Sequence, residues 1–188
     1  MATGKRRLFL PAAWTAACLA AGIARTAASQ SPVSVDLDVA SVQRSLDQGA
    51  YDAAEREARV LADRLEKEEE SPLERLRAQD LLVDALIRNG KASAPGTLAL
   101  AERVVSSKEQ LFHRDDLEIA TSLHLLGAVH TERGEFSASI PIHERALSIR
   151  QKTLHPNDPA VADSLDYLAL PLIRLQRFAD ARERESQP

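Results

Sequence analysis

A repeat with a period of 42 residues constrains this chain more than any other feature of its sequence. Residues 112–123 (FHRDDLEIATSL) align without a gap on residues 154–165 (LHPNDPAVADSL), with five identities in twelve positions. Chance gives about one identity in that length at ordinary residue frequencies. The same shift extends further, since Phe136 falls on Phe178. The sequence therefore predicts an array of similar units that stack on one another.

Each unit has the apolar periodicity of two helices. In the unit around residue 125, residues that can face a core recur at spacings of three and four, which places them on one helical face. They are Ile119, Leu123, Leu126 and His130. Gly134 then suits a left-handed helix C-cap, and Phe136 opens a second helix. Aromatic residues make up only 4% of the chain, which favours helices with small, interdigitating cores over β-sandwiches.

The boundaries of the predicted helices carry capping residues. Asp158 followed by Pro159 is typical of an N-cap and its first helical residue. Ser71, Pro72 and Glu74 predict a capping box at the start of an earlier helix. The predicted hairpins cover residues 35–70, 72–112, 117–154 and 159–188.

The first and last hairpins depart from the pattern. The first helix of the first hairpin is predicted to be short, at about residues 38–47. In the last hairpin Pro171 is expected to kink the first helix, and Gln176 stands where a turn glycine is expected. The remaining segment, RFADARERESQP, is expected to be a shortened second helix. It is either a polar cap or the start of further repeats.

These residues resemble a known family. A helix pair that carries small residues at Gly127 and Ser139, a turn at Gly134 and an aromatic residue at Phe136 is similar to the tetratricopeptide repeat. The length of 42 residues and the bridge HPNDPAVA resemble its longer kinesin-light-chain type more than the 34-residue standard repeat or HEAT and armadillo repeats. The resemblance implies an all-α, right-handed superhelical solenoid of antiparallel helix hairpins over residues 35–188.

The resemblance also implies a peptide-binding groove along the first helices. The repeat register assigns Leu82, Leu86 and Ala128 to this groove together with six polar residues. The polar candidates are Gln79, Thr121, His124, Asp163, Asp166 and Arg174. The asparagines with which the family holds a peptide backbone are replaced here by His124-Leu125 and Asp166-Tyr167, so those contacts are not expected. The alternative is that these are ordinary solvated helix residues.

The N-terminus has the three parts of a secretory signal peptide: basic residues 1–7, an apolar stretch at 8–24, and small residues up to Ala28. We expect cleavage after Ala28, followed by a flexible linker at residues 29–34. An uncleaved membrane anchor at residues 8–24 and a lipidated Cys18 are the alternatives. Cleavage removes four positive charges and no negative ones, so the net charge moves from −4 to −8.

Charge and composition argue against several functions. An acidic chain is a poor nucleic-acid binder. The exported form would contain no thiol for a disulfide, a nucleophile or a metal site. His113 and His155 occupy equivalent positions in separate units, which favours a structural role in the loops over catalysis or metal binding. Phosphate loops, HExxH and GxSxG are absent from the sequence. We therefore expect no catalytic residue, no metal and no small-molecule cofactor.

The sequence predicts an exported scaffold that binds a protein or peptide partner, with membrane contact only if the N-terminal segment is retained. One alternative is the N-terminal repeat arm of a larger exported enzyme, for example a protease-like one, of which this chain is a fragment. Another is a lone array whose last unit is covered by self-association.

Overall fold

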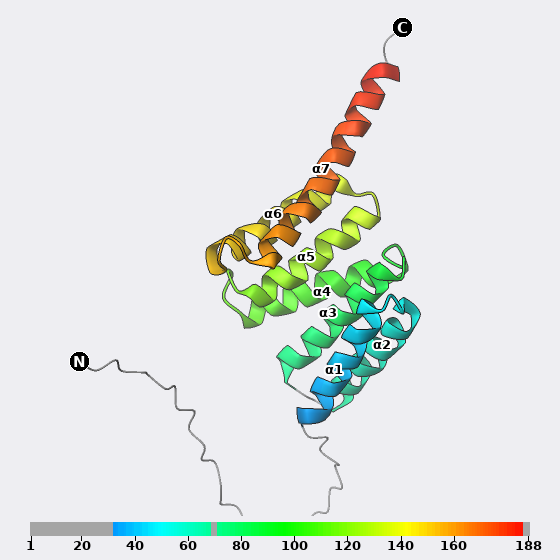
Figure 1. Ribbon diagram of the computed structural model, residues 1–188, viewed down its shortest axis with the longest axis vertical. Helices are drawn as coiled ribbons and strands as arrows, with labels where there is room; N and C mark the ends of the chain where they lie inside the picture. Colours follow the sequence, from blue (N-terminus) through cyan, green and yellow to red (C-terminus); the bar gives the residue numbers. More distant parts are fainter. Residues whose placement is uncertain (1–31, 69–70, 186–188) are drawn as a thin grey trace, which may run out of the picture.

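The computed structural model describes residues 32–68 and 71–185, which form a layered stack of α-helices with no strand in either range (Figure 1). The seven helices of this part are α1 (Pro32–Asp47), α2 (Tyr51–Lys67), α3 (Pro72–Arg88), α4 (Thr97–Leu111), α5 (Leu117–Glu132), α6 (Phe136–Thr153) and α7 (Pro159–Glu185). The first six helices form three hairpins. α7 packs mainly on α6 and then extends beyond the other helices (Figure 1).

Glycines in the left-handed region end the first helices of the hairpins. Gly134 has a φ of 75°, and the N–H after it, on Glu135, donates to the carbonyl of His130 at 2.9 Å. Gly90 has a φ of 69°, and the N–H of Lys91 donates to the carbonyl of Leu86 at 2.8 Å. A residue with a Cβ is strained in this conformation. The predicted C-cap at Gly134 is therefore confirmed.

Two of the predicted helix starts differ in how they are capped. An oxygen of Asp158 accepts a hydrogen bond from the N–H of Ala160 at 2.9 Å, as predicted. Its equivalent Asp116 accepts one from the N–H of Glu118 at 2.8 Å. Ser71 does precede α3, but its side chain makes no capping hydrogen bond, so the predicted capping box is wrong. Glu74, its expected partner, instead lines a groove described below.

The hairpins are held by two apolar clusters, one centred on α1, α2 and α3 and the other on α3, α4, α5 and α6. In the third hairpin, α5 and α6 meet at Gly127 and His143. A Cβ on Gly127 would lie 2.6 Å from Cε1 of His143, well inside contact distance. His143 is 1% exposed and therefore lies in the core. Gly127 is therefore small because the two helices approach closely, as expected.

The beginning of the array corrects one expectation. α1 starts at Pro32, so it is longer than the predicted helix at residues 38–47, and residues 32–34 are helical instead of linker. Proline fits the first turn of a helix because its missing N–H has no helical partner there. The predicted signal peptide at residues 1–28 lies outside the described residues.

The last described helix corrects another expectation. The predicted hairpin at residues 159–188 is wrong: its described part, Pro159–Glu185, is one continuous helix, α7, which passes through Pro171 and Gln176 without a turn. Gln176 lacks the freedom of glycine to adopt the left-handed turn conformation, so the helix continues where Gly134 ends its equivalent. Pro171 is fully buried. No second helix of the described ranges covers α7, and Leu165, Leu172 and Ile173 are consequently about half exposed.

No helix in the described ranges combines the length and the hydropathy that crossing a membrane requires.

Candidate functional site

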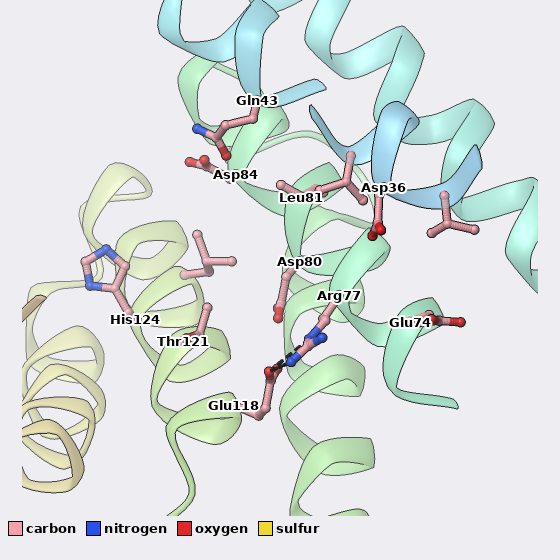
Figure 2. A pocket seen from close by; sticks show the side chains of 13 residues that line it. Asp36, Gln43, Glu74, Arg77, Asp80, Leu81, Asp84, Glu118, Thr121 and His124 are labelled. Carbon is pink, nitrogen blue, oxygen red and sulfur yellow. Dashed lines mark hydrogen bonds and ion pairs between the residues drawn. The ribbon is translucent and has the colours of Figure 1, made fainter. Parts of the chain in front are cut away.

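The first helices of the three hairpins, α1, α3 and α5, line a common groove with a volume of about 460 Å³. Figure 2 shows side chains from all three helices directed toward it. Its polar lining consists of Asp36, Gln43, Glu74, Arg77, Asp80, Asp84, Glu118, Thr121 and His124, and its apolar lining of Val35, Val39, Leu81 and Leu125. A concave surface that combines apolar side chains with polar groups is typical of a binding site.

α3 contributes the largest share of the lining because it lies between the other two helices. Glu74, Arg77, Leu81 and Asp84 recur along α3 at spacings of three and four, so they share one face. α1 reaches this face from one side and α5 from the other (Figure 2). The stacking of hairpins thus brings together residues that lie far apart in the sequence.

A buried ion network lies beneath the groove. The Nζ of Lys108 on α4 is fully buried and lies 2.6 Å from Asp80 and 2.8 Å from Glu118. The hydroxyl of Ser122 donates to Asp80 at 2.8 Å. Burial raises the pKa of Asp80, and the hydrogen bonds from Lys108 and Ser122 oppose this effect. Because a buried charge without a partner is strongly unfavourable, this network holds α3, α4 and α5 together.

Arg77 closes the network at the groove surface. Its Nε donates to Glu118 at 2.9 Å, and its side chain is 55% exposed (Figure 2). Burial alone would raise the pKa of Glu118, but hydrogen bonds from Arg77 and Lys108 lower it overall. Glu118 is therefore an anion at neutral pH, shared between a buried cation and a surface cation.

The structure brings together two of the six predicted groove residues. Thr121 and His124 line the groove from α5. Gln79 does not: it faces a separate hollow between α2, α3 and α4, on the other side of α3. The predicted groove positions Leu82, Leu86 and Ala128 are buried in the core. The repeat register identifies equivalent positions, but the packing of successive hairpins decides which neighbour each position faces.

The other three predicted residues lie on α7. Asp163, Asp166 and Arg174 are exposed and are not among the residues that line the groove. Tyr167, their neighbour, contacts His124 with ring centroids 4.3 Å apart. A role of these three residues in binding stays a prediction.

The sequence reasoning missed most of the groove, including Asp36, Glu74, Arg77 and Asp84. One signal was present: charged residues at 74, 77 and 84 with Leu81 among them, all at helical spacing. Such a pattern is also typical of a solvated helix face, so it does not identify a groove without the positions of α1 and α5.

A second cluster lies where α5, α6 and α7 meet. The rings of His124 and His143 have centroids 5.9 Å apart, and Arg150 lies close enough to influence both electrostatically. Burial, with a contribution from Arg150, lowers the pKa of His124 to about 3 and that of His143 to about 4. Both histidines are therefore neutral at physiological pH and act as packing residues.

The two loop histidines are exposed. Nδ1 of His155 accepts a hydrogen bond from the N–H of Asn157 at 3.2 Å, so it supports the loop before α7. The carbonyl of His113 accepts one from the N–H of Asp116 at 2.9 Å. In the part of the chain that the structure describes, no three or more His, Cys, Asp or Glu side chains are grouped as metal ligands would be.

Comparisons with known proteins agree with this architecture. The sequence profile described as "Tetratricopeptide repeat" matches residues 118–187. No curated protein sequence matches the chain. Among solved structures, the chain is similar to the nearly identical TPR-like repeats of a protein described as a kinesin light chain from Podosopora anserina. The similarity has a TM-score of 0.68 at 20% identity and covers 81% of this chain and 72% of that one.

A variant of the same repeats with one substitution gives a TM-score of 0.68 at 21% identity, over 82% of this chain and 72% of that one. At this level of identity the likeness concerns the fold. The predicted all-α, tetratricopeptide-like solenoid is confirmed.

Proposed function

We propose that this chain is a protein-binding scaffold that holds a segment of a partner in the groove of α1, α3 and α5. The groove itself carries the proposal, because three successive first helices present one concave surface with both apolar and polar side chains. Repeat arrays commonly use such extended concave surfaces for binding, and an apolar lining with polar groups along it suits a peptide segment.

The test uses two positions that the repeat makes equivalent but the fold separates. Thr121 is exposed in the groove, whereas Gln79 faces the hollow on the other side of α3. Peptides would be selected from a random library on the full chain, and their affinity measured for Thr121→Lys and Gln79→Lys. A lysine in the groove obstructs a bound segment, so we expect Thr121→Lys to weaken binding about tenfold or more and Gln79→Lys to leave it nearly unchanged.

The control is circular dichroism, which should show both variants folded. Equal weakening by the two substitutions, or no selected peptide that responds to Thr121→Lys, would contradict binding in the groove.

We also propose that the protein is exported after removal of residues 1–28. The support is the sequence pattern alone: a basic start, an apolar stretch and small residues before Ser29. Expression of the full chain in its organism of origin, followed by mass spectrometry of its N-terminus, tests the proposed cleavage. We expect an N-terminus at Ser29, within a few positions. An intact N-terminus on membrane-bound protein would favour the anchor at residues 8–24.

The alternative that the chain is the arm of a larger enzyme stays a prediction from the sequence.

A further inference from the structure

The groove contains far more acidic than basic side chains. Among the described residues, five carboxylates line it, from Asp36, Glu74, Asp80, Asp84 and Glu118, against the single guanidinium of Arg77. His124 adds no charge at neutral pH, because burial lowers its pKa to about 3. The lining of this surface is therefore strongly anionic before its internal ion pairs are considered.

The carboxylates differ in how well the protein itself neutralises them. Asp80 and Glu118 are held by Lys108, and Glu118 also by Arg77. Asp84 is paired with Arg88, at 2.9 Å, one helical turn away. Asp36 has no ion pair with any described residue. Glu74 also has none with a described residue, and it interacts with Arg77 only electrostatically, at longer range. The negative charge that remains for a ligand is thus concentrated at Asp36 and Glu74.

The placement of these residues is as informative as their number. Figure 2 shows Gln43 and Asp84 together near one end of the groove and Glu74, Arg77 and Glu118 toward the other, with Leu81 between the two groups. Val35, Val39 and Leu125 complete the apolar part of the lining. An apolar strip bordered by carboxylates, of which Asp36 and Glu74 form no ion pair with a described residue, complements a segment whose apolar side chains are flanked by cations.

We infer that the groove selects a basic, amphipathic segment of a partner protein, one that presents apolar side chains between lysines or arginines. This inference rests on the proposed function and adds the chemistry of the partner to it. Apolar burial supplies the affinity, while the carboxylates attract the flanking cations and repel acidic segments.

Arg77 has a specific consequence in this arrangement. It is the one cation among the lining residues that the structure describes, and it occupies the exposed side of Glu118. Its guanidinium therefore competes with a cation of the partner for the same carboxylate. Removing it leaves Glu118 paired with the buried Lys108 and open on its groove side.

The experiment measures fluorescence anisotropy of three labelled peptides of about 14 residues, roughly 20 Å long as helices. The first contains leucine and arginine at helical spacing, the second leucine and glutamate, and the third serine and arginine. We expect the full chain to bind the first peptide at least about tenfold more tightly than either of the others. This preference should weaken with added salt, since exposed charges are screened.

Two sets of variants connect the preference to the groove. Asp36→Asn with Glu74→Gln should weaken binding of the leucine–arginine peptide about three- to tenfold. Glu132→Gln with Glu144→Gln changes the net charge equally at exposed positions outside the groove lining, and should leave the affinity within about twofold. Arg77→Ala should tighten binding about two- to fivefold.

The outcomes separate this inference from the proposed function. If the leucine–glutamate peptide binds best and Thr121→Lys abolishes its binding, the groove binds peptides but our inference about charge is overturned. The inference is also overturned if both pairs of charge substitutions weaken binding of the leucine–arginine peptide equally, or if Arg77→Ala weakens this binding. If no peptide binds in a way that depends on Thr121, the proposed function fails as well.

Discussion

Two buried cations, related by the 42-residue repeat, hold their neighbours in different ways. Lys108 lies on α4 between α3 and α5, and Arg150 occupies the equivalent position on α6 between α5 and α7. Lys108 donates to the backbone carbonyl of Glu118 at 3.2 Å, and Arg150 donates to that of Ala160 at 3.2 Å. We call these places the Lys108 junction and the Arg150 junction. The contact between the cation and the next first helix is the same at both.

The side chains around the two cations are not the same. Lys108 is paired with the carboxylates of Asp80 and Glu118. One repeat later these positions are Ser122 and Ala160. Arg150 instead hydrogen-bonds the hydroxyl of Ser164 at 2.6 Å, and burial lowers its pKa despite the field of Asp163 and Asp158. The repeat therefore keeps the place of the cation, while the side chains that hold it differ between the two junctions.

The largest expected effect comes from removing the two cations. Lys108→Met leaves Asp80 buried without its cation, so we expect a loss of about 3–5 kcal/mol in the free energy of unfolding. Arg150→Met leaves no buried carboxylate behind and should lose only about 1–2 kcal/mol, the worth of its hydrogen bonds. Urea unfolding followed by circular dichroism measures both. Similar losses would show that the carboxylates of the Lys108 junction do not matter.

A double variant sharpens the same comparison. Lys108→Met combined with Asp80→Asn removes the unpaired buried charge, so part of the stability lost in the single variant should return.

The second effect on stability comes from how closely another helix packs on α5 and on α7. Gly127 on α5 lies against the ring of His143 on α6, whereas its equivalent Ala169 on α7 is exposed. Gly127→Ala introduces a Cβ into a fully packed contact, and we expect a loss of about 1–3 kcal/mol in the free energy of unfolding. Ala169→Val should change it by less than about 0.5 kcal/mol. A large loss from Ala169→Val would mean that α7 is covered in solution.

The third effect is a dependence on pH at the Arg150 junction. His124 and His143 have folded pKa values of about 3 and about 4, below the ordinary value of 6.5. Below pH 6.5 the unfolded state binds more protons than the folded state, so stability is full above this pH and falls as the pH drops toward 4. Each histidine contributes a slope of at most about 1.4 kcal/mol per pH unit.

The measurement is urea unfolding between pH 7 and pH 4.5. His124→Gln with His143→Gln retains every carboxylate of the chain and should lose most of the slope in this range. Burial, together with the positive field of Arg150 and, at His124, of Arg88, keeps the histidines neutral in the folded state. An unchanged slope in the double variant would assign the pH dependence to carboxylates instead.

The smallest effect on the free energy of unfolding comes from removing the helix N-caps, and it should be equal at the two junctions. Asp116 and Asp158 are equivalent N-caps, with nearly the same capping distance. Replacing either by alanine should lower the free energy of unfolding by about 1 kcal/mol, the usual value of a cap. A clear difference between Asp116→Ala and Asp158→Ala would show that the stability of α5 and that of α7 depend differently on their neighbours.

Local chemistry explains which features were predicted correctly. The N-cap at Asp158, the C-cap at Gly134 and the small residue at Gly127 depend on residues adjacent in the chain or on the same hairpin. Their sequence patterns therefore carry the information directly. The long first helix and the undivided α7 were missed because proline and glutamine at a boundary permit more than one outcome, which packing then settles.

The groove could be predicted only in part for a related reason. Thr121 and His124 line this groove, but the equivalent Gln79 faces the other side of α3. Most of the charged lining, including Asp36 and Glu74, looks like an ordinary solvated helix face in the sequence. A groove is a relation between helices, and helical periodicity describes each helix by itself.

By itself the sequence determined the repeat, its helical hairpins and the residues that cap them, because these follow from backbone geometry and from interactions within about one unit. Tertiary structure decided that Asp80 is buried against Lys108, that α7 remains a single helix with an exposed apolar face, and that carboxylates from three helices converge on one groove. These features depend on how separate hairpins approach one another. That approach is set by the sum of many weak side-chain contacts across the stack, which no local pattern records.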